Sequence, residues 1–234
     1  MLKVIDSAVP VECWSCSVAH NEVTLFCPNC RKIQPPQEGN YFAVFNLDPR
    51  LNIDLEALER EFHRFSRRLH PDRFARASEN EKEWSLADTA LLNDAYRTLK
   101  DPIRRTEYLL KLHGAQIGEE HAGKNRRPHE MGASRAPADL LEEVFDLNMQ
   151  LEEMRMAKAS GEEDPALEQS LIAAKTKFEG LLNAVDGDLR GEWNAWDNGD
   201  EGARHAAQNK MVALLDRRRY LSNLVREVNE TLGA

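Results

Sequence analysis

The apolar residues of this chain recur at helical spacing. Between residues 54 and 69 the apolar positions are three, four, three and four residues apart: Leu55, Leu58, Phe62, Phe65 and Leu69. This spacing puts them on one stripe of an amphipathic helix. Asp54 is a suitable N-cap, and Pro71 ends the helix because proline disfavours helical geometry at the residue before it.

The same periodicity predicts five more helices, at 79–99, 102–112, 137–158, 164–186 and 200–231. Asp101-Pro102 separates the first two of these, and glycines between residues 187 and 199 separate the last two. Alternation of apolar and polar residues never extends beyond a few positions. The pattern therefore predicts an all-α fold whose last three helices close a small bundle.

Proline and glycine mark the expected domain boundaries. Gln34-Pro-Pro-Gln-Glu-Gly-Asn40 indicates a linker, and residues 114–136 contain four glycines, one proline and scattered charges. We therefore expect a four-cysteine segment at 1–37, a helical domain at 38–113, a linker at 114–136 and a three-helix domain at 137–234.

Composition and charge restrict the class of protein. The 234-residue chain is 41% apolar and 30% charged, and it has no apolar run near the length of about 18 residues that a membrane span needs. Its start lacks the pattern of a secretory signal, so the expected compartment is the cytoplasm. Residues 1–136 carry 20 acidic and 20 basic side chains, and residues 137–234 carry 20 acidic and 11 basic. The acidic part is a poor nucleic-acid binder, and is either a solvated surface or a partner-binding face.

All four cysteines lie within the first 30 residues, in the pairs Cys13-Trp-Ser-Cys16 and Cys27-Pro-Asn-Cys30. Each pair lets two thiolates converge on one ion, and two pairs complete the closed tetrahedral site of structural zinc. We expect one structural Zn ion at these cysteines. A segment of 37 residues is too short for a sufficient core, so metal binding should contribute to its folding free energy.

Three alternatives remain for the cysteines. Disulfides are disfavoured in the expected reducing compartment, and a redox-active pair lacks its usual βαβ context. Spacing alone does not separate zinc from a four-sulfur iron site. In each metal-bound case all positions are filled by protein ligands, so no catalytic position remains open.

The loop after the first long helix contains His70-Pro71-Asp72. The helix before it has a basic face opposite the apolar stripe, and the basic residues continue beyond the loop: Arg60, Arg64, Arg67, Arg68, Arg73 and Arg76. A basic face is usually only solvated. A tripeptide is a weak signal by itself, so the interpretation rests on its place between a basic amphipathic helix and a longer apolar-striped helix.

In this context residues 40–113 resemble a J domain, the module with which DnaJ-type co-chaperones stimulate DnaK-type ATPase chaperones. The resemblance implies that the loop and the basic face dock on the chaperone. The residues carried over are His70, Pro71 and Asp72, with Arg67 and Arg68 as helpers. We do not expect an enzyme, because no nucleophile, phosphate-binding loop or open metal motif accompanies the histidine and aspartate.

The helix after Pro137 has two apolar faces. One is the expected core stripe: Leu140, Val144, Leu147, Leu151 and Met154. The other lies about 100–180° away: Leu141, Phe145, Met149 and Met156. This second face either packs against another part of the chain or forms a partner-binding groove.

The last helix has its own core line: Leu214, Leu221, Val225, Val228 and Leu232. Tyr220 points about 100° off this line, where it is able to join the second apolar face of the earlier helix. We expect the run Arg217-Arg-Arg219 to be solvated.

The phrases Glu107-Tyr-Leu-Leu-Lys-Leu-His-Gly114 and Leu151-Glu-Glu-Met154 resemble one branch of J proteins, the HscB-type co-chaperones of iron–sulfur cluster assembly. The four-cysteine head resembles the zinc-binding extension of some members. The resemblance implies that the iron–sulfur scaffold protein binds the second apolar face and its acidic flank: Leu141, Phe145, Asp146, Met149, Glu153 and Tyr220. Two positions depart from the family, since Met149 replaces an expected acidic residue and Glu142 an expected apolar one.

The expected function is that of a co-chaperone. The three-helix domain holds the scaffold protein, and the J domain delivers it to a DnaK/HscA-type chaperone and accelerates ATP hydrolysis there. Holding both partners raises their effective concentration. Neither a membrane nor a nucleic acid is an expected partner. The alternatives are a J protein with a different client, and a zinc-ribbon module that binds nucleic acid or senses redox state.

Overall fold

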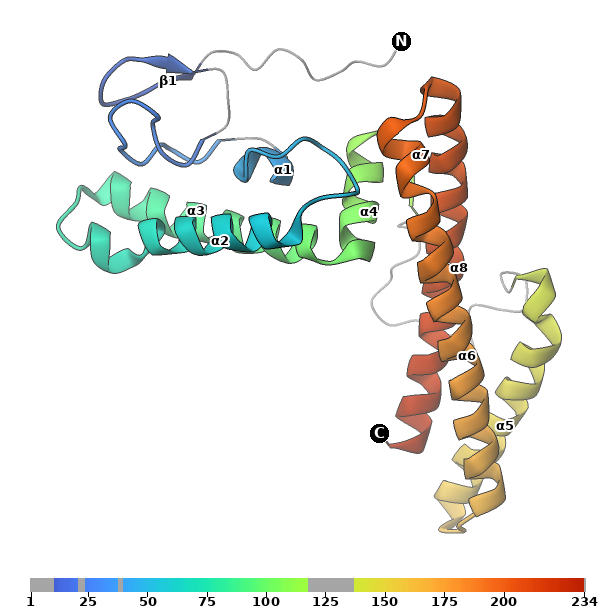
Figure 1. Ribbon diagram of the computed structural model, residues 1–234. Coiled ribbons are helices and arrows are strands. Elements are labelled where there is room, and N and C mark those ends of the chain that lie inside the picture. Colours follow the sequence, from blue (N-terminus) through green and yellow to red (C-terminus); the bar gives the residue numbers. More distant parts are fainter. Residues whose placement is uncertain (1–10, 21–23, 38–39, 118–136, 234) are drawn as a thin grey trace. The chain divides into compact units, whose positions relative to one another are not determined.

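The computed structural model describes residues 11–20, 24–37, 40–117 and 137–233. The chain divides into two compact units, Met1–Leu109 and Leu110–Ala234 (Figure 1). The linker expected at 114–136 lies outside the described residues, except for residues 114–117. The four-part division expected from the sequence therefore stays a prediction. No described helix combines the length and the apolar character that a membrane crossing requires.

Within the described residues, β-structure is confined to the four-cysteine segment. Strand β1 (Val11–Glu12) pairs antiparallel with β2 (Ala19–His20), and a single bridge joins Phe26 to Ile33. One C-x-x-C pair lies between β1 and β2, and the other lies between the two residues of the bridge. The remaining elements are helical, which confirms the predicted all-α fold with a small ribbon-like segment at its start.

The first unit continues with α1 (Tyr41–Val44), α2 (Leu55–Leu69), the short 3-10 helix η1 (Pro71–Phe74), α3 (Glu79–Lys100) and most of α4 (Pro102–Leu112). Helices α2 and α3 lie side by side (Figure 1). Their facing stripes bury Leu58, Leu69, Leu92 and Leu99. Leu55 is an exception in the predicted stripe, because it is exposed in the first turn of α2.

Side-chain caps fix where α2 and α3 begin. Asp54 Oδ1 accepts a hydrogen bond from Ala57 N (2.9 Å), as predicted for an N-cap. At the start of α3, Ser78 and Glu81 form a capping box in which each side chain bonds the other residue's backbone N–H. The Ser78 cap fixes the start of α3 just after the His-Pro-Asp loop and η1, whereas the Asp54 cap lies at the opposite end of α2.

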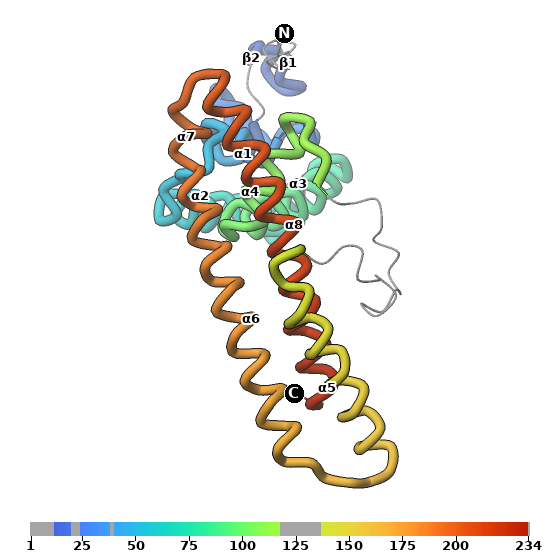
Figure 2. The backbone as a smooth tube through the Cα atoms, turned by 90° about the vertical axis from the view of Figure 1, so that its right-hand side faces the viewer, coloured from blue at the N-terminus to red at the C-terminus, as the bar shows by residue number. Residues whose placement is uncertain are grey.

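The second unit contains η4 (Ala138–Leu140), α5 (Leu141–Ser160), α6 (Pro165–Gly191), α7 (Trp193–Asn198) and α8 (Glu201–Leu232). Helix α6 packs along α8, and α5 packs against both (Figure 2). The predicted core stripe of α5 is confirmed, and it packs against Leu171, Phe178, Val185, Leu221, Leu224 and Val228 from the other two helices. The three long helices therefore form the predicted bundle.

Helix α7 is absent from the sequence-based expectation, which placed only a break between residues 187 and 199. Its two tryptophans, Trp193 and Trp196, are buried, and the Trp196 ring meets the ring of His113 edge-on at 5.0 Å. Packing of these aromatic rings, rather than an apolar period, stabilises this one and a half turns of helix.

The expectation for the arginine run in α8 is wrong in part. Arg217 forms a bidentate pair with Asp139 (2.9 and 2.7 Å), and Arg218 pairs with Asp186 (2.6 Å). These aspartates lie far away in the sequence, on η4 and α6. The two guanidinium groups therefore link helices of the bundle instead of being only solvated.

Candidate functional site

The four cysteine sulfurs converge at one point of the first unit. All four Sγ atoms lie within 4.8 Å of one another, with 3.6 Å between Cys13 and Cys30 and 3.7 Å between Cys16 and Cys27. Sulfurs placed tetrahedrally at about 2.3 Å from a zinc ion are about 3.8 Å apart. The cysteines are not disulfide-bonded. Their arrangement fits a four-sulfur metal centre.

Both C-x-x-C pairs use the same backbone turn. The N–H of the first cysteine donates to the carbonyl five residues on, at 3.0 Å for Cys13 and 2.9 Å for Cys27. The residue four positions on has a positive φ, 57° at Ser17 and 62° at Arg31. Residues other than glycine rarely adopt this left-handed conformation. The repeated turn aims both sulfurs of each pair at one point.

Hydrogen-bond donors surround the sulfurs. Ser15 N and Gln34 Nε2 donate to Cys13 Sγ, at 3.4 and 3.5 Å. Burial raises the pKa of Cys13, but backbone and thiol hydrogen bonds outweigh it and lower that pKa to about 6. The N–H of Lys32 lowers the pKa of Cys30, but burial and the neighbouring thiols raise it to about 11. The pKa of Cys16 is lowered as well, chiefly by a backbone hydrogen bond from Val18, so the cluster favours some thiolates and needs a cation to hold four.

The His-Pro-Asp loop is short and exposed at the end of α2. His70 Nδ1 lies 3.4 Å from the backbone N of Asp72 and caps η1, and it lies 3.5 Å from Asp72 Oδ2. Pro71 occupies the first position of η1, where its missing N–H is not needed. The His70 backbone is extended, as expected before proline. The loop thus presents one imidazole and one carboxylate on a turn that is held by the hydrogen bond from Asp72 N to His70 Nδ1.

The arginines of α2 are not equivalent. Arg60 and Arg64 pair with acidic side chains near the start or in the middle of the same helix. Arg67 and Arg68 form no ion pair with any described residue, and Arg67 Nε donates only to the carbonyl of His63 (3.1 Å). The two arginines beside the loop therefore keep their charges available for a partner.

The second apolar face of α5 is exposed. Leu141, Phe145, Met149 and Met156 show 43%, 65%, 51% and 63% of their surface to solvent. We call these four residues the α5 patch. A contiguous exposed apolar stripe of this kind typically marks an interaction surface. Among the described residues of the second unit none covers the α5 patch, so packing of this face against a third helix of the bundle is excluded.

The predicted polar neighbours of the α5 patch differ in their exposure. Asp146 and Glu153 are exposed on α5, on one flank of the patch. Tyr220 of α8 is half-buried and packs against the bundle core. Burial raises the pKa of its hydroxyl, so it stays protonated. The first two are free to contact a partner, whereas Tyr220 offers only part of its side chain.

A hairpin of two helices joined by an exposed His-Pro-Asp loop, beside which two arginines form no ion pair with a described residue, defines a J-domain co-chaperone. No protein-family model matches the chain. A search of curated proteins does find relatives. The co-chaperone protein HscB homolog of Vibrio cholerae is 31% identical over 82% of this chain and 94% of its own length. The chain therefore belongs to the HscB family of co-chaperones.

The chain is similar to a further curated relative and to two solved structures. The iron-sulfur cluster co-chaperone protein HscB of mouse is 29% identical over 94% of the chain and 82% of the relative. The chain is also similar in structure to human HscB, with a TM-score of 0.64, 24% identity and coverage of 94% of this chain and 98% of that one. The HscB structure from Vibrio cholerae gives a TM-score of 0.55 at 26% identity, over 82% of this chain and 96% of that one.

Proposed function

We propose that the chain binds an iron–sulfur cluster scaffold protein and stimulates the ATPase of a DnaK/HscA-type chaperone. The observation that carries this proposal is the exposed His-Pro-Asp loop next to two arginines without an acidic partner among the described residues. The exposed α5 patch on the other unit supplies a second, apolar surface for the scaffold protein.

The loop and the arginines have different tasks in this proposal. Guanidinium groups of Arg67 and Arg68 pair with acidic side chains of the chaperone and hold it in register. The braced turn then places His70 and Asp72 against the chaperone. All covalent chemistry takes place in the chaperone, so the role of this chain is to bind and to position.

We infer that the four cysteines hold one zinc ion. Cysteine thiolates are ligands that suit zinc, and the sulfur separations match its tetrahedral geometry. Hydrogen-bond donors from Ser15 and Gln34 supply the outer support that a metal-bound thiolate needs. Zinc in a closed site of this kind supplies folding free energy and no reaction step.

The α5 patch contains one aromatic ring and two methionines. Methionine is flexible and polarisable, which lets one surface fit an irregular partner face. Asp146 and Glu153 on the flank of the patch favour a partner that carries basic side chains there. Because both partners bind the same chain, the scaffold protein meets the chaperone at a raised effective concentration.

The test is the substitution His70→Gln. We expect it to abolish stimulation of the chaperone's steady-state ATPase rate, because glutamine lacks the imidazole that contacts the chaperone and braces η1. His205→Gln is the matched control, an exposed histidine on α8 of the second unit. Circular dichroism should show the same helix content in both variants. Full stimulation by a folded His70→Gln variant would contradict the assignment of the loop.

A further inference from the structure

The four-cysteine segment docks on the two helices that flank the His-Pro-Asp loop. Lys32 Nζ forms an ion pair with Glu81 Oε1 at the start of α3 (3.2 Å). One turn further along α3, the ring of Trp84 meets the ring of Trp14 edge-on, with 5.6 Å between their centres. The segment is thus anchored to the unit that carries the proposed chaperone-binding surface.

A third contact reaches α2 itself. The Phe26 ring lies parallel to that of Phe65, with 6.4 Å between their centres. On the Phe26 ring lies the guanidinium group of Arg68, 3.7 Å from the ring centre. Cation–π stacking of this kind fixes a side chain that otherwise samples many rotamers. Arg68 is therefore held in place by a residue of the four-cysteine segment.

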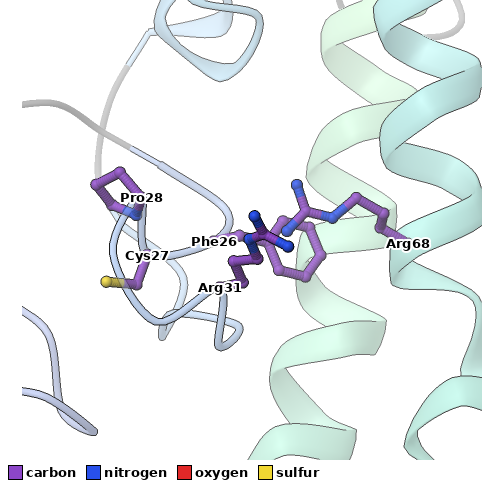
Figure 3. A pocket seen from close by; sticks show the side chains of 5 residues that line it. All are labelled: Phe26, Cys27, Pro28, Arg31 and Arg68. Carbon is purple, nitrogen blue, oxygen red and sulfur yellow. The ribbon is translucent and has the colours of Figure 1, made fainter.

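Arg31 brings a second guanidinium group to the same place. It follows Cys30 directly, and it is exposed although its backbone has the unfavourable positive φ of 62°. Figure 3 shows its guanidinium group beside the Phe26 ring, facing that of Arg68. Phe26, Cys27, Pro28, Arg31 and Arg68 line an open cleft of about 400 Å³. The Cys27 sulfur points away from both arginines (Figure 3), and it lies 3.7 Å from the Cys16 sulfur.

No acidic side chain among the described residues partners the two guanidinium groups of this cleft. Neither Arg31 nor Arg68 forms an ion pair with any residue that the structure describes. Burial lowers the pKa of Arg68, and the charges of Arg64, Arg31 and Arg73 lower it further. Two facing guanidinium groups repel each other unless an anion lies between them. The cleft is therefore arranged to receive one.

We propose that Phe26, Arg31 and Arg68 form one composite site, built half from the metal-binding segment and half from α2, that binds an aspartate or glutamate side chain of the DnaK/HscA-type chaperone. This inference rests on the proposed function and adds a role for the metal centre. The metal holds the turn that places Arg31, and so determines the affinity for the chaperone.

A chaperone carboxylate fits this site better than a nucleic acid does. Arg68 is two residues from His70, so a protein bound at the loop reaches the cleft directly. A planar guanidinium pair matches a single carboxylate. Nucleic-acid binding instead needs many phosphate contacts, and residues 1–136 have no excess of basic side chains, 20 against 20 acidic.

The test compares Arg31→Asn, Arg68→Gln and the double variant. Asparagine tolerates a positive φ, so it removes the guanidinium group and keeps the turn. Ser17→Asn introduces asparagine at the matching turn position of the other C-x-x-C pair without removing a charge. Arg97→Asn removes an exposed charge near the far end of α3. Zinc content is measured for each variant, together with the equilibrium affinity for the ATP-bound chaperone at low salt.

We expect each single variant of the cleft to weaken binding about three- to tenfold, the range for a partly exposed charge-assisted pair. The double variant should lose little more than one single variant, because both arginines bind one carboxylate. Zinc removal from the wild type should weaken binding by a similar factor, and Arg31→Asn should then have no further effect. Both controls should bind as the wild type does.

Other results would overturn the inference. Wild-type affinity of a zinc-loaded Arg31→Asn variant, with binding still lost in His70→Gln, would reject the composite site and leave the proposed function standing. Binding of a short RNA that Arg31→Asn abolishes, with unchanged chaperone affinity, would assign the cleft to nucleic acid instead. A wild type that neither binds nor stimulates the chaperone would reject the proposed function, and the inference with it.

Discussion

The two units each expose one face of an amphipathic helix, and the two faces are built differently. On α2 the exposed face is basic, and one of its arginines is held against an aromatic ring at 3.7 Å. On α5 the exposed face is apolar, and no described residue covers Phe145. A charged side chain fixed in advance gives orientation and selectivity, whereas an uncovered apolar patch gives contact area that adapts to its partner.

The two units also differ in whether a buried acidic side chain has a partner. In the first unit Asp88 of α3 is buried, and neither of its carboxylate oxygens has a hydrogen-bond partner among the described residues. In the second unit Glu227 of α8 is buried, and its Oε1 pairs with Arg155 of α5 at 2.7 Å. A buried acid without a partner makes stability depend on pH, so the first unit should be the more pH-sensitive one.

Metal removal should have the largest effect, and only on the first unit. A strong chelator should unfold residues 11–37, because this segment has few large buried side chains and metal binding supplies most of its folding free energy, about 10 kcal/mol or more in small zinc modules. Hydrogen exchange with mass spectrometry should show lost protection there and unchanged protection in α5, α6 and α8. Retained protection of residues 24–37 without metal would contradict a structural metal.

The substitution Asp88→Asn tests whether the buried acid makes the stability of the first unit depend on pH. Burial raises the pKa of Asp88 from 3.8 to about 7. Between these values the folded state keeps a proton that the unfolded state has released, so stability falls as pH rises from about 4 to about 7. Asparagine removes this dependence and should stabilise the chain at pH 8, on the order of 2 kcal/mol or more.

Thermal unfolding at several pH values measures this effect. The control is Asp94→Asn, which changes the same charge at an exposed position of α3. The control should keep the wild-type slope of stability against pH. An Asp88→Asn variant with that same slope would show that Asp88 does not carry the dependence.

Phe145→Ala should weaken scaffold binding about tenfold, because truncating a central aromatic residue of an interface removes on the order of 1–3 kcal/mol. Stimulation of the chaperone without scaffold protein should not change. Ile172→Ala is the control, an exposed apolar residue on α6 outside the α5 patch. Titration calorimetry distinguishes the two variants, and equal binding by both would exclude Phe145 from the interface.

Added salt should weaken binding at the two surfaces to different degrees, and this effect should be smaller than those above. Raising the ionic strength from about 0.05 to 0.5 M shortens the range of charge interactions, so chaperone affinity should fall several-fold. Scaffold affinity should fall less, since it depends mainly on apolar contact. Equal salt dependence at the two surfaces would remove the distinction between them.

The sequence predicts those parts of the structure whose causes are local. Apolar periodicity locates α2, α3, α5, α6 and α8, since each needs only one stripe to pack. The C-x-x-C spacing predicts the cluster of sulfurs, because two short turns set it. The second stripe of α5 shows that this helix has an extra face, and the resemblance to the family supplies the expected partner.

What the sequence misses depends on contacts between distant segments. No pattern links Phe26 to Phe65 and Arg68, so the docking of the metal-binding segment on α2 and the role of Arg31 are not foreseeable. A positive φ at an arginine leaves no mark in the sequence either. Helix α7 is shorter than any periodicity can detect, and its two tryptophans are stabilised by packing.

The most direct test measures the steady-state ATPase rate of a purified DnaK/HscA-type chaperone with this protein, with and without the iron–sulfur scaffold protein. Two surfaces on one chain predict stimulation by this protein alone, and a synergistic further rise when the scaffold protein is added. Stimulation that is indifferent to the scaffold protein would leave a J protein with a different client, and no stimulation of a competent chaperone would contradict the proposed function.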